Sequence, residues 1–203
     1  YEQILAEERI EAGYNKPGLL MVCQTKEALK HEIELVEITN QYGLEASVLS
    51  KEETEKLDPN VAYNMAGSVY FGCDGWMTPN VFMDQFKALL IKRGVKIDYQ
   101  TELQEISVRG NQITEFVTNR GSYQADEYII AAGSWSPRLA KKLKIDIPLQ
   151  PGKGYSFNIE KSPVSPKLPS ILVEGRIATT PMLNGLRIAG TMEITGVNHD
   201  INM

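Results

Sequence analysis

Apolar positions in the first part of the chain alternate between strand-like runs and helical spacing. The run at 18–23 has the length of a strand, and Thr25 then precedes apolar residues spaced as on a surface helix. Ser50 and Glu53 have the spacing of a capping box, which predicts the start of a short charged helix. Two further segments have the composition of strands, 46–49 and 67–71.

A long amphipathic helix is predicted next. Thr78 suits the N-cap and Pro79 the first helical position, and apolar residues then form one stripe up to Gly94. The segments that follow are short and extended, with a tight turn at Gly110-Asn111, so we expect a meander of antiparallel strands. Its strands are expected at 95–99, 103–108, 113–118 and 123–125.

The run 128–133 is continuously apolar and ends in small residues, which is typical of a strand buried on both faces. Ser134 then suits the N-cap of a helix that reaches Leu143. Beyond residue 147, strands alternate with turns, and a hairpin turn is expected at 183–185. The pattern as a whole predicts an α+β fold with some α/β elements and a mixed, largely antiparallel sheet.

Charge and hydropathy argue against nucleic-acid binding and against a membrane span. The 203 residues include 21 basic and 26 acidic side chains, and the lysines and arginines are not clustered in any one segment. We therefore expect no nucleic-acid partner. The longest apolar runs, such as 18–23, are far shorter than the roughly 20 residues of a spanning helix, so no membrane span is expected.

Cofactor-independent catalytic constellations are also missing. His31 lies on a polar helix face and His199 in a polar tail, and neither has a plausible nucleophile as partner. Cys23 and Cys73 are far apart, so we expect free thiols and neither a disulfide nor a metal site. This cysteine usage favours a reducing, cytoplasmic setting, with no catalytic side chain and no metal ligand assigned.

Two glycine-containing segments are candidate ligand sites. In 131–136, small residues allow the close approach of a flat ligand, and a helix N-terminus offers N–H groups to a pyrophosphate. The same residues also suit simple packing of a strand against a helix. In 152–156, two glycines permit unusual backbone angles, and Tyr155 and Ser156 could line a polar pocket or belong to a plain loop.

Two arginines on the predicted hairpin are candidate anion ligands. Arg176 and Arg187 could each bind a substrate carboxylate, because guanidinium pairs with carboxylate in a bidentate manner. Surface ion pairs across the strands, with Glu193 for example, explain the same residues equally well.

Taken in order along the chain, these segments resemble the flavin-dependent D-amino-acid dehydrogenases of the D-amino-acid oxidase-like family. The resemblance covers nearly the whole sequence and is carried by the ordered set rather than by any one motif. The matching segments are 18–20, 72–79, 94–96, 101–103, 125–126, 131–136, 148–156, 171–178 and 187–193.

The resemblance implies that the parent protein holds FAD in a Rossmann-like domain and binds an amino acid between the flavin and a mixed-sheet substrate domain. Residues 78–146 would then be a portion of the FAD domain, and residues 1–77 and 147–203 would be two parts of the substrate domain. The implied cofactor-binding residues are Leu103 at the adenine, Ala132, Gly133 and Trp135 at the dinucleotide, and Gly152 and Gly154 toward the isoalloxazine.

The resemblance also implies the reaction and the substrate-binding residues. In such enzymes the substrate Cα hydrogen passes as hydride to flavin, and water converts the resulting imine into an oxo acid and ammonia. Tyr155 and Arg176 would contact a small D-amino acid. Here Gly175 stands where the family pattern has a tyrosine, so the substrate can instead be a 2-hydroxy acid or an N-methyl amine such as sarcosine. A non-catalytic binding module is the alternative outside enzymes.

A nucleotide-binding fingerprint is missing from the sequence. No Gly-x-Gly-x-x-Gly occurs in the 203 residues, which favours an internal fragment of a larger oxidoreductase, with the remainder of the parent chain as its partner. We therefore expect the fragment alone to bind FAD weakly or not at all and to have no turnover.

Overall fold

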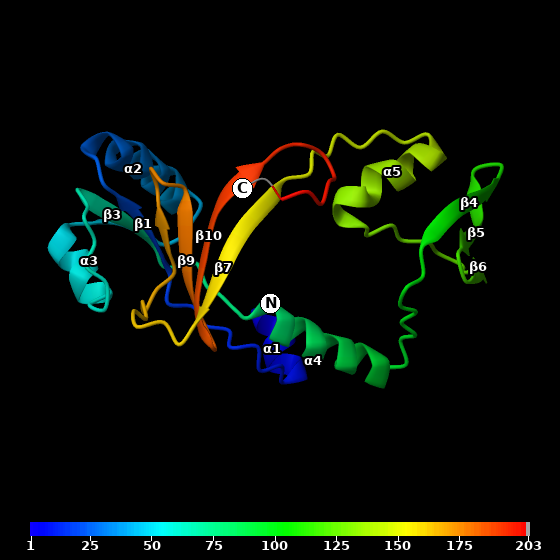
Figure 1. Cartoon of the computed structure of the whole chain (residues 1–203), viewed down its shortest axis with the longest axis horizontal. Coiled ribbons are helices and arrows are strands. Elements are labelled where there is room, and N and C mark those ends of the chain that lie inside the picture. Colours follow the sequence, from blue (N-terminus) through cyan, green and yellow to red (C-terminus); the bar gives the residue numbers. More distant parts are fainter. Residues whose placement is uncertain (202–203) are drawn as a thin grey trace. The chain divides into compact units, whose positions relative to one another are not determined.

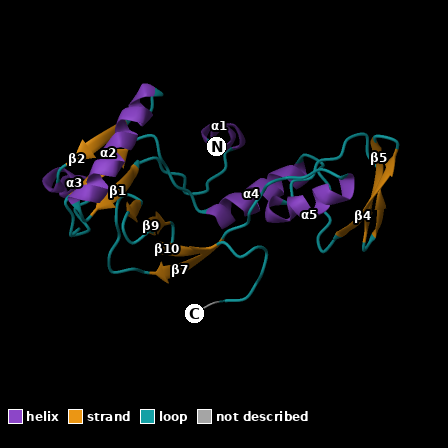
Figure 2. Ribbon diagram, turned by 90° about the horizontal axis from the view of Figure 1, so that it is seen from above, coloured by secondary structure: helices purple, strands orange, loops and turns teal. Residues whose placement is uncertain are grey.

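The computed structural model describes residues 1–201, which divide into two compact units (Figures 1 and 2). Unit 1 comprises residues 1–94 and 154–191. Unit 2 comprises residues 95–153 together with the residues from 192 onward.

Unit 1 is built on a mixed sheet. Within residues 1–201 it has seven strands in the order β2-β3-β1-β8-β9-β10-β7. The pairs β1–β3, β2–β3, β8–β9 and β9–β10 are antiparallel, whereas β1 and β8 are parallel. The predicted α+β fold with a largely antiparallel sheet is therefore confirmed. The strands are β1 (Leu19–Cys23), β2 (Ala46–Leu49), β3 (Gly67–Phe71), β7 (Lys153–Glu160), β8 (Ser170–Leu172), β9 (Ile177–Met182) and β10 (Gly185–Glu193).

Capping residues fix the starts of two helices of unit 1. Thr25 accepts a hydrogen bond from the Ala28 N–H at the start of α2, and Ser50 and Glu53 form the predicted capping box at the start of α3. The predicted positions of both helices are confirmed. The helices of this unit are α1 (Glu2–Glu8), α2 (Lys26–Gln41), α3 (Lys51–Leu57) and α4 (Pro79–Lys92).

Alternate residues of β1 contribute to two separate cores. Leu20 and Val22 are buried on one face, where Tyr63 and Leu168 pack against them. Met21 points to the other face, which α2 covers (Figure 1). Because successive side chains of a strand point to opposite faces, burial on both sides explains why 18–23 reads as an unbroken apolar run.

The N-terminal segment packs on α4. Leu5, Ile10 and Ala12 are buried against Phe82, whose ring stacks on that of Phe86 with centroids 5.4 Å apart. The predicted apolar stripe of this helix therefore has a partner. Thr78 does precede the helix, but its side chain makes no capping hydrogen bond.

Unit 2 contains the predicted meander. Its three-stranded antiparallel sheet has the order β4-β5-β6, and Gly110 adopts a positive φ of 64° at the first turn. The helix expected at 134–143 is divided into short pieces. The elements are β4 (Leu103–Arg109), β5 (Gln112–Thr118), β6 (Gly121–Tyr123), α5 (Ser136–Ala140), and 3₁₀ turns at Gly133–Trp135 and Lys141–Leu143.

Two strand predictions in this unit are wrong. Residues 95–99 and 128–133 are not in strands, and Ile129, expected to be buried, is 85% exposed. A buried strand needs hydrogen-bonded neighbours, and within residues 1–201 no strand pairs with either segment. The apolar run at 128–133 therefore has the composition of a core strand without the surroundings of one.

Three further expectations concern thiols, metals and membranes. Cys23 and Cys73 are both free, as predicted. Among residues 1–201, no group of three His, Cys, Asp or Glu side chains is placed to hold a metal ion. None of the helices in the same range is long and apolar enough to span a membrane.

Candidate functional site

A cavity of about 350 Å³ lies in unit 2 beside the antiparallel meander. We call it the meander cavity. Cavities of this size are typical of small-molecule sites. It is lined by Asp98, Thr101, Leu103, Phe116, Thr118, Tyr123, Ile129, Ile130, Ala131, Ala132 and Leu139.

The apolar walls of the meander cavity come from two segments far apart in sequence. Leu103 and Phe116 lie on β4 and β5, which pair in antiparallel register. Residues 129–132 face them, and the Tyr128 ring lies 4.7 Å from that of Phe116, between centroids. The exposed segment 128–133 thus contributes a wall to a cavity rather than a strand to a core.

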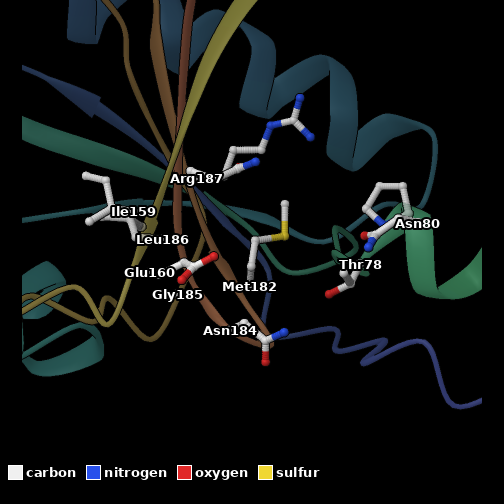
Figure 3. Close-up of a pocket in the computed structure, with 11 residues that line it drawn as sticks. Thr78, Asn80, Ile159, Glu160, Met182, Asn184, Gly185, Leu186 and Arg187 are labelled. Atoms are coloured by element: carbon white, nitrogen blue, oxygen red, sulfur yellow. The ribbon is translucent and has the colours of Figure 1, made fainter.

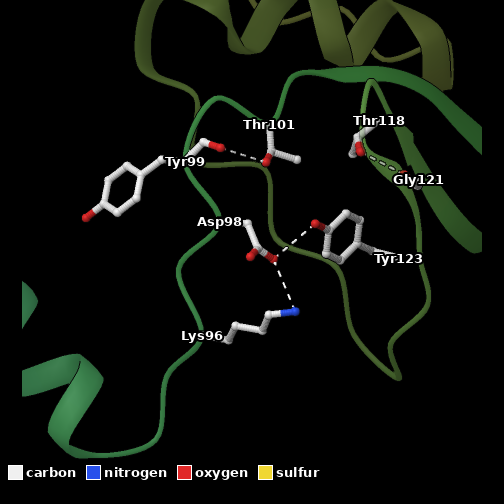
Figure 4. Close-up of polar contacts among 7 residues, drawn as sticks. All are labelled: Lys96, Asp98, Tyr99, Thr101, Thr118, Gly121 and Tyr123. Atoms are coloured by element: carbon white, nitrogen blue, oxygen red, sulfur yellow. Dashed lines mark hydrogen bonds and ion pairs between the residues drawn. The ribbon is translucent and has the colours of Figure 1, made fainter.

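Asp98, one of the residues that line the meander cavity, contacts two polar side chains (Figure 4). The Tyr123 hydroxyl donates a hydrogen bond of 3.0 Å to Asp98 Oδ2, and Lys96 Nζ lies 3.7 Å from the same oxygen. Thr118 donates to the Gly121 carbonyl at 2.7 Å, and Thr101 to the Tyr99 carbonyl at 3.1 Å. The lining includes a carboxylate but no basic side chain, so it suits ligand hydroxyl and amino groups better than phosphate.

Two predicted cofactor residues meet in this cavity. Leu103 and Ala132, 29 positions apart in the sequence, both line it. Two further predicted cofactor residues, Gly133 and Trp135, follow Ala132 closely in the sequence. Gly133 has a positive φ of 52° with open space where a Cβ would be, and Trp135 is 48% exposed. Small, open backbone at 132–133 leaves room for a flat ligand to approach.

The remaining predicted residues lie on or beside β7 and β9. Gly152 lies against Met192, whose sulfur would be 3.0 Å from an added Cβ, whereas Gly154 has open space around it. Tyr155 is half-buried, and Arg176 is exposed in a turn with φ of 50°. Neither Tyr155 nor Arg176 lines the meander cavity.

A second cavity, of about 240 Å³, lies in unit 1 between the start of α4 and the strands β7, β9 and β10 (Figure 3). We call it the α4 cavity. Sequence reasoning missed most of its residues, although the alternating polar positions 156, 158 and 160 of β7 were a usable signal. It is lined by Thr78, Pro79, Asn80, Asn158, Ile159, Glu160, Met182, Asn184, Gly185, Leu186 and Arg187.

Three neighbouring hydroxyl groups line a third cavity, of about 260 Å³, in unit 1. Ser170 Oγ and Thr179 Oγ1 are 2.7 Å apart, and the Tyr63 hydroxyl lies 3.5 Å from Ser170 Oγ. Burial raises the pKa of Tyr63 to about 12. This phenol is therefore a proton-bearing hydrogen-bond donor at neutral pH and not a base.

The mixed sheet and the antiparallel meander define an α+β protein with cavities in both units. Comparison with known proteins narrows the class. The family described as DAO, FAD dependent oxidoreductase, matches residues 1–202, and the chain belongs to this family.

Curated relatives and solved structures agree with that membership. D-amino acid dehydrogenases of Vibrio vulnificus (strain CMCP6) and Allorhizobium ampelinum are 31% and 30% identical, over 96% and 98% of this chain. Glycine oxidase structures from Geobacillus kaustophilus and Bacillus cereus superpose with TM-scores of 0.86 and 0.82 at 19% and 21% identity, over 99% of this chain. The similarity to these two glycine oxidase structures shows the fold of this chain.

The chain spans about half the length of these proteins. It covers 48% of each of the two dehydrogenases, and 54% and 56% of the two glycine oxidase chains. The predicted flavin-oxidoreductase family is therefore confirmed, while the activity of a whole protein is a separate question.

Proposed function

We propose that this chain forms part of an FAD-dependent oxidoreductase that oxidises a small D-amino acid to its 2-oxo acid. Membership of the FAD-dependent family and about 30% identity to D-amino acid dehydrogenases support this activity. The observation that carries the role of the chain is that Leu103 and Ala132 line one cavity.

The meander cavity fits the adenosine end of FAD. Its apolar walls can contact both faces of a flat ring, and Asp98 supplies an acceptor for hydroxyl or amino hydrogens. The open backbone at Gly133 continues from this cavity, so the diphosphate would pass the N–H groups at 133–135. The residues that would hold the cofactor here are Leu103, Ala132, Gly133 and Trp135, with Gly152 and Gly154 toward the flavin ring.

The chemistry is divided between the cofactor and the protein. When bound, FAD supplies the acceptor for the hydride that leaves the substrate Cα, and water then converts the imine to a 2-oxo acid and ammonia. The chain would supply binding and orientation, with Tyr155 and Arg176 toward the substrate. In this proposal residues 78–146 belong to the FAD domain, and 1–77 and 147–203 to the substrate domain.

The test is anaerobic reduction of the purified full-length protein. Loss of the visible flavin absorption band is expected on adding D-alanine and other small D-amino acids, and not on adding their L-enantiomers. Reduction by sarcosine or a 2-hydroxy acid alone would reject the D-amino acid substrate. A full-length protein that purifies and refolds without flavin would favour a non-catalytic binding module.

A further inference from the structure

The α4 cavity is lined by one acidic and one basic side chain, which lie on the same face of the neighbouring strands β7 and β10. Ser156, Asn158 and Glu160 occupy alternate positions of β7, so their side chains share one face. The Arg187 guanidinium donates a hydrogen bond of 3.1 Å to Ser156 Oγ, which places Arg187 on that face as well. Arg187 and Glu160 both line the cavity (Figure 3).

Arg187 donates one hydrogen bond to Ser156, but within the described residues neither of these two charges takes part in an ion pair. Among residues 1–201, neither Arg187 nor Glu160 has an oppositely charged atom within 4.0 Å. They do not pair with each other either, although both line a cavity of about 240 Å³. A guanidinium and a carboxylate held apart across a small cavity suit a ligand that carries both signs of charge.

Neutral polar groups of the same cavity complete this pattern. Asn80, Asn158 and Asn184 each present an amide, which can donate and accept. Thr78 Oγ1 is buried and has no hydrogen-bond partner, and it does not cap α4. This hydroxyl oxygen is not exposed to the cavity, so the polar contacts available to a ligand come from the three amides and the two charged side chains.

We propose that the α4 cavity is a binding site for a small zwitterion, an α-amino acid. Its carboxylate would accept hydrogen bonds from Arg187, and its ammonium group would donate to Glu160 and the amide oxygens. The side chain of the ligand would lie against Met182 and Leu186. None of these residues belongs to the proposed cofactor set, so this site can bind its ligand without FAD.

The experiment is an NMR titration of the ¹⁵N-labelled chain without FAD, using glycine and both enantiomers of alanine. Saturable shifts are expected at Gly185 and neighbouring residues of the α4 cavity. Acetate and methylamine, which each carry one of the two charges, should bind at least ~10-fold more weakly than glycine, because each lacks a charge-assisted hydrogen bond.

Variants then locate the site. Arg187→Met and Glu160→Gln should each weaken glycine binding by at least ~10-fold. The matched controls Arg109→Met and Glu105→Gln, exposed positions on β4 of unit 2, should leave it unchanged. Asn158→Ala, an exposed position of β7, should also weaken binding by removing an amide oxygen that accepts from the ammonium group, which covers the case in which the other variants fold poorly.

Several outcomes overturn the proposal. They are the absence of saturable shifts with glycine, equal weakening in the control variants, and acetate binding as tightly as glycine. The outcome is independent of the proposed oxidoreductase activity, since no flavin is present. A preference for one alanine enantiomer would separate a substrate-like amino acid from a ligand recognised only by its charges.

Discussion

At the scale of single residues, Asp58 shows how one buried carboxylate joins two loops. It is fully buried, and its Oδ1 accepts a hydrogen bond of 3.1 Å from the Lys167 N–H. The Tyr63 hydroxyl lies 3.4 Å from Oδ2. Asn60 makes a second link, from its Nδ2 to the Ser165 carbonyl at 2.7 Å.

Replacing Asp58 therefore has a definite expected cost. Asp58→Ala leaves the Lys167 N–H without its acceptor, and we expect the free energy of unfolding to fall by about 2 kcal/mol. Urea denaturation of the chain measures it. The exposed Asp74→Ala serves as the control and should change stability by less than about 0.5 kcal/mol. Equal losses in the two variants would contradict the role of Asp58.

The two thiols should differ in reactivity. Burial raises the pKa of Cys23 to about 11, and the carboxylates of Glu32 and Glu174 add to the shift. The folded state thus keeps this thiol protonated, and its contribution to stability is lost as the pH rises from about 9 through 11. At pH 8 we expect iodoacetamide to alkylate the half-buried Cys73 and to leave Cys23 unmodified, as read by mass spectrometry.

A control for the thiol prediction is the Cys73→Ser variant. This variant should take up no label at pH 8 until denaturant is added. Rapid labelling of Cys23 in the folded protein would show that its surroundings are open to solvent.

Residues that line the cavities could be predicted from sequence only in part. The family resemblance selected Leu103 and Ala132, and the structure places both in the meander cavity. The α4 cavity was missed because Glu160 and Arg187 line the same cavity only through the order of β7 and β10 in the sheet. Sequence spacing alone carries no information on which strands are neighbours.

At the scale of elements, two of the four N-caps predicted from local sequence are formed, whereas Thr78 makes no capping hydrogen bond and Ser134 lies within a 3₁₀ turn. Capping at Thr25 and Ser50 depends on residues three positions away, and both caps are present. The strands expected at 95–99 and 128–133 failed because a strand depends on partners elsewhere in the chain. An apolar run predicts burial, but it does not supply the neighbour that buries it.

The capping box of α3 gives a prediction at this scale. Ser50→Ala removes the acceptor for the Glu53 N–H, and we expect the free energy of unfolding to fall by about 1 kcal/mol. Thermal and urea denaturation measure it. Ser50→Asp keeps an acceptor at the same position and should retain most of the stability, so an equally large loss there would argue against capping as the cause.

At the scale of the whole molecule, the chain should be insufficient for tight FAD binding. It spans about half of its relatives and contains no Gly-x-Gly-x-x-Gly segment, so much of the diphosphate and flavin contacts would be missing. Calorimetric titration of the 203 residues with FAD is expected to give no affinity in the micromolar range. A dissociation constant of about 1 μM or below would contradict this prediction.

The central claim is that the meander cavity receives part of the FAD molecule. Filling it should therefore displace the cofactor from the full-length protein. Ala132→Trp places a large ring inside the cavity, whereas Ala125→Trp adds the same ring at an exposed position outside it. Circular dichroism would establish that both variants are folded.

The most direct measurement is the FAD dissociation constant of these two variants in the full-length protein, followed by flavin fluorescence. The account predicts that Ala132→Trp weakens FAD binding by at least ~10-fold and that Ala125→Trp binds as the unmodified protein does. Equal affinities for the two variants would contradict the placement of the cofactor beside Leu103 and Ala132.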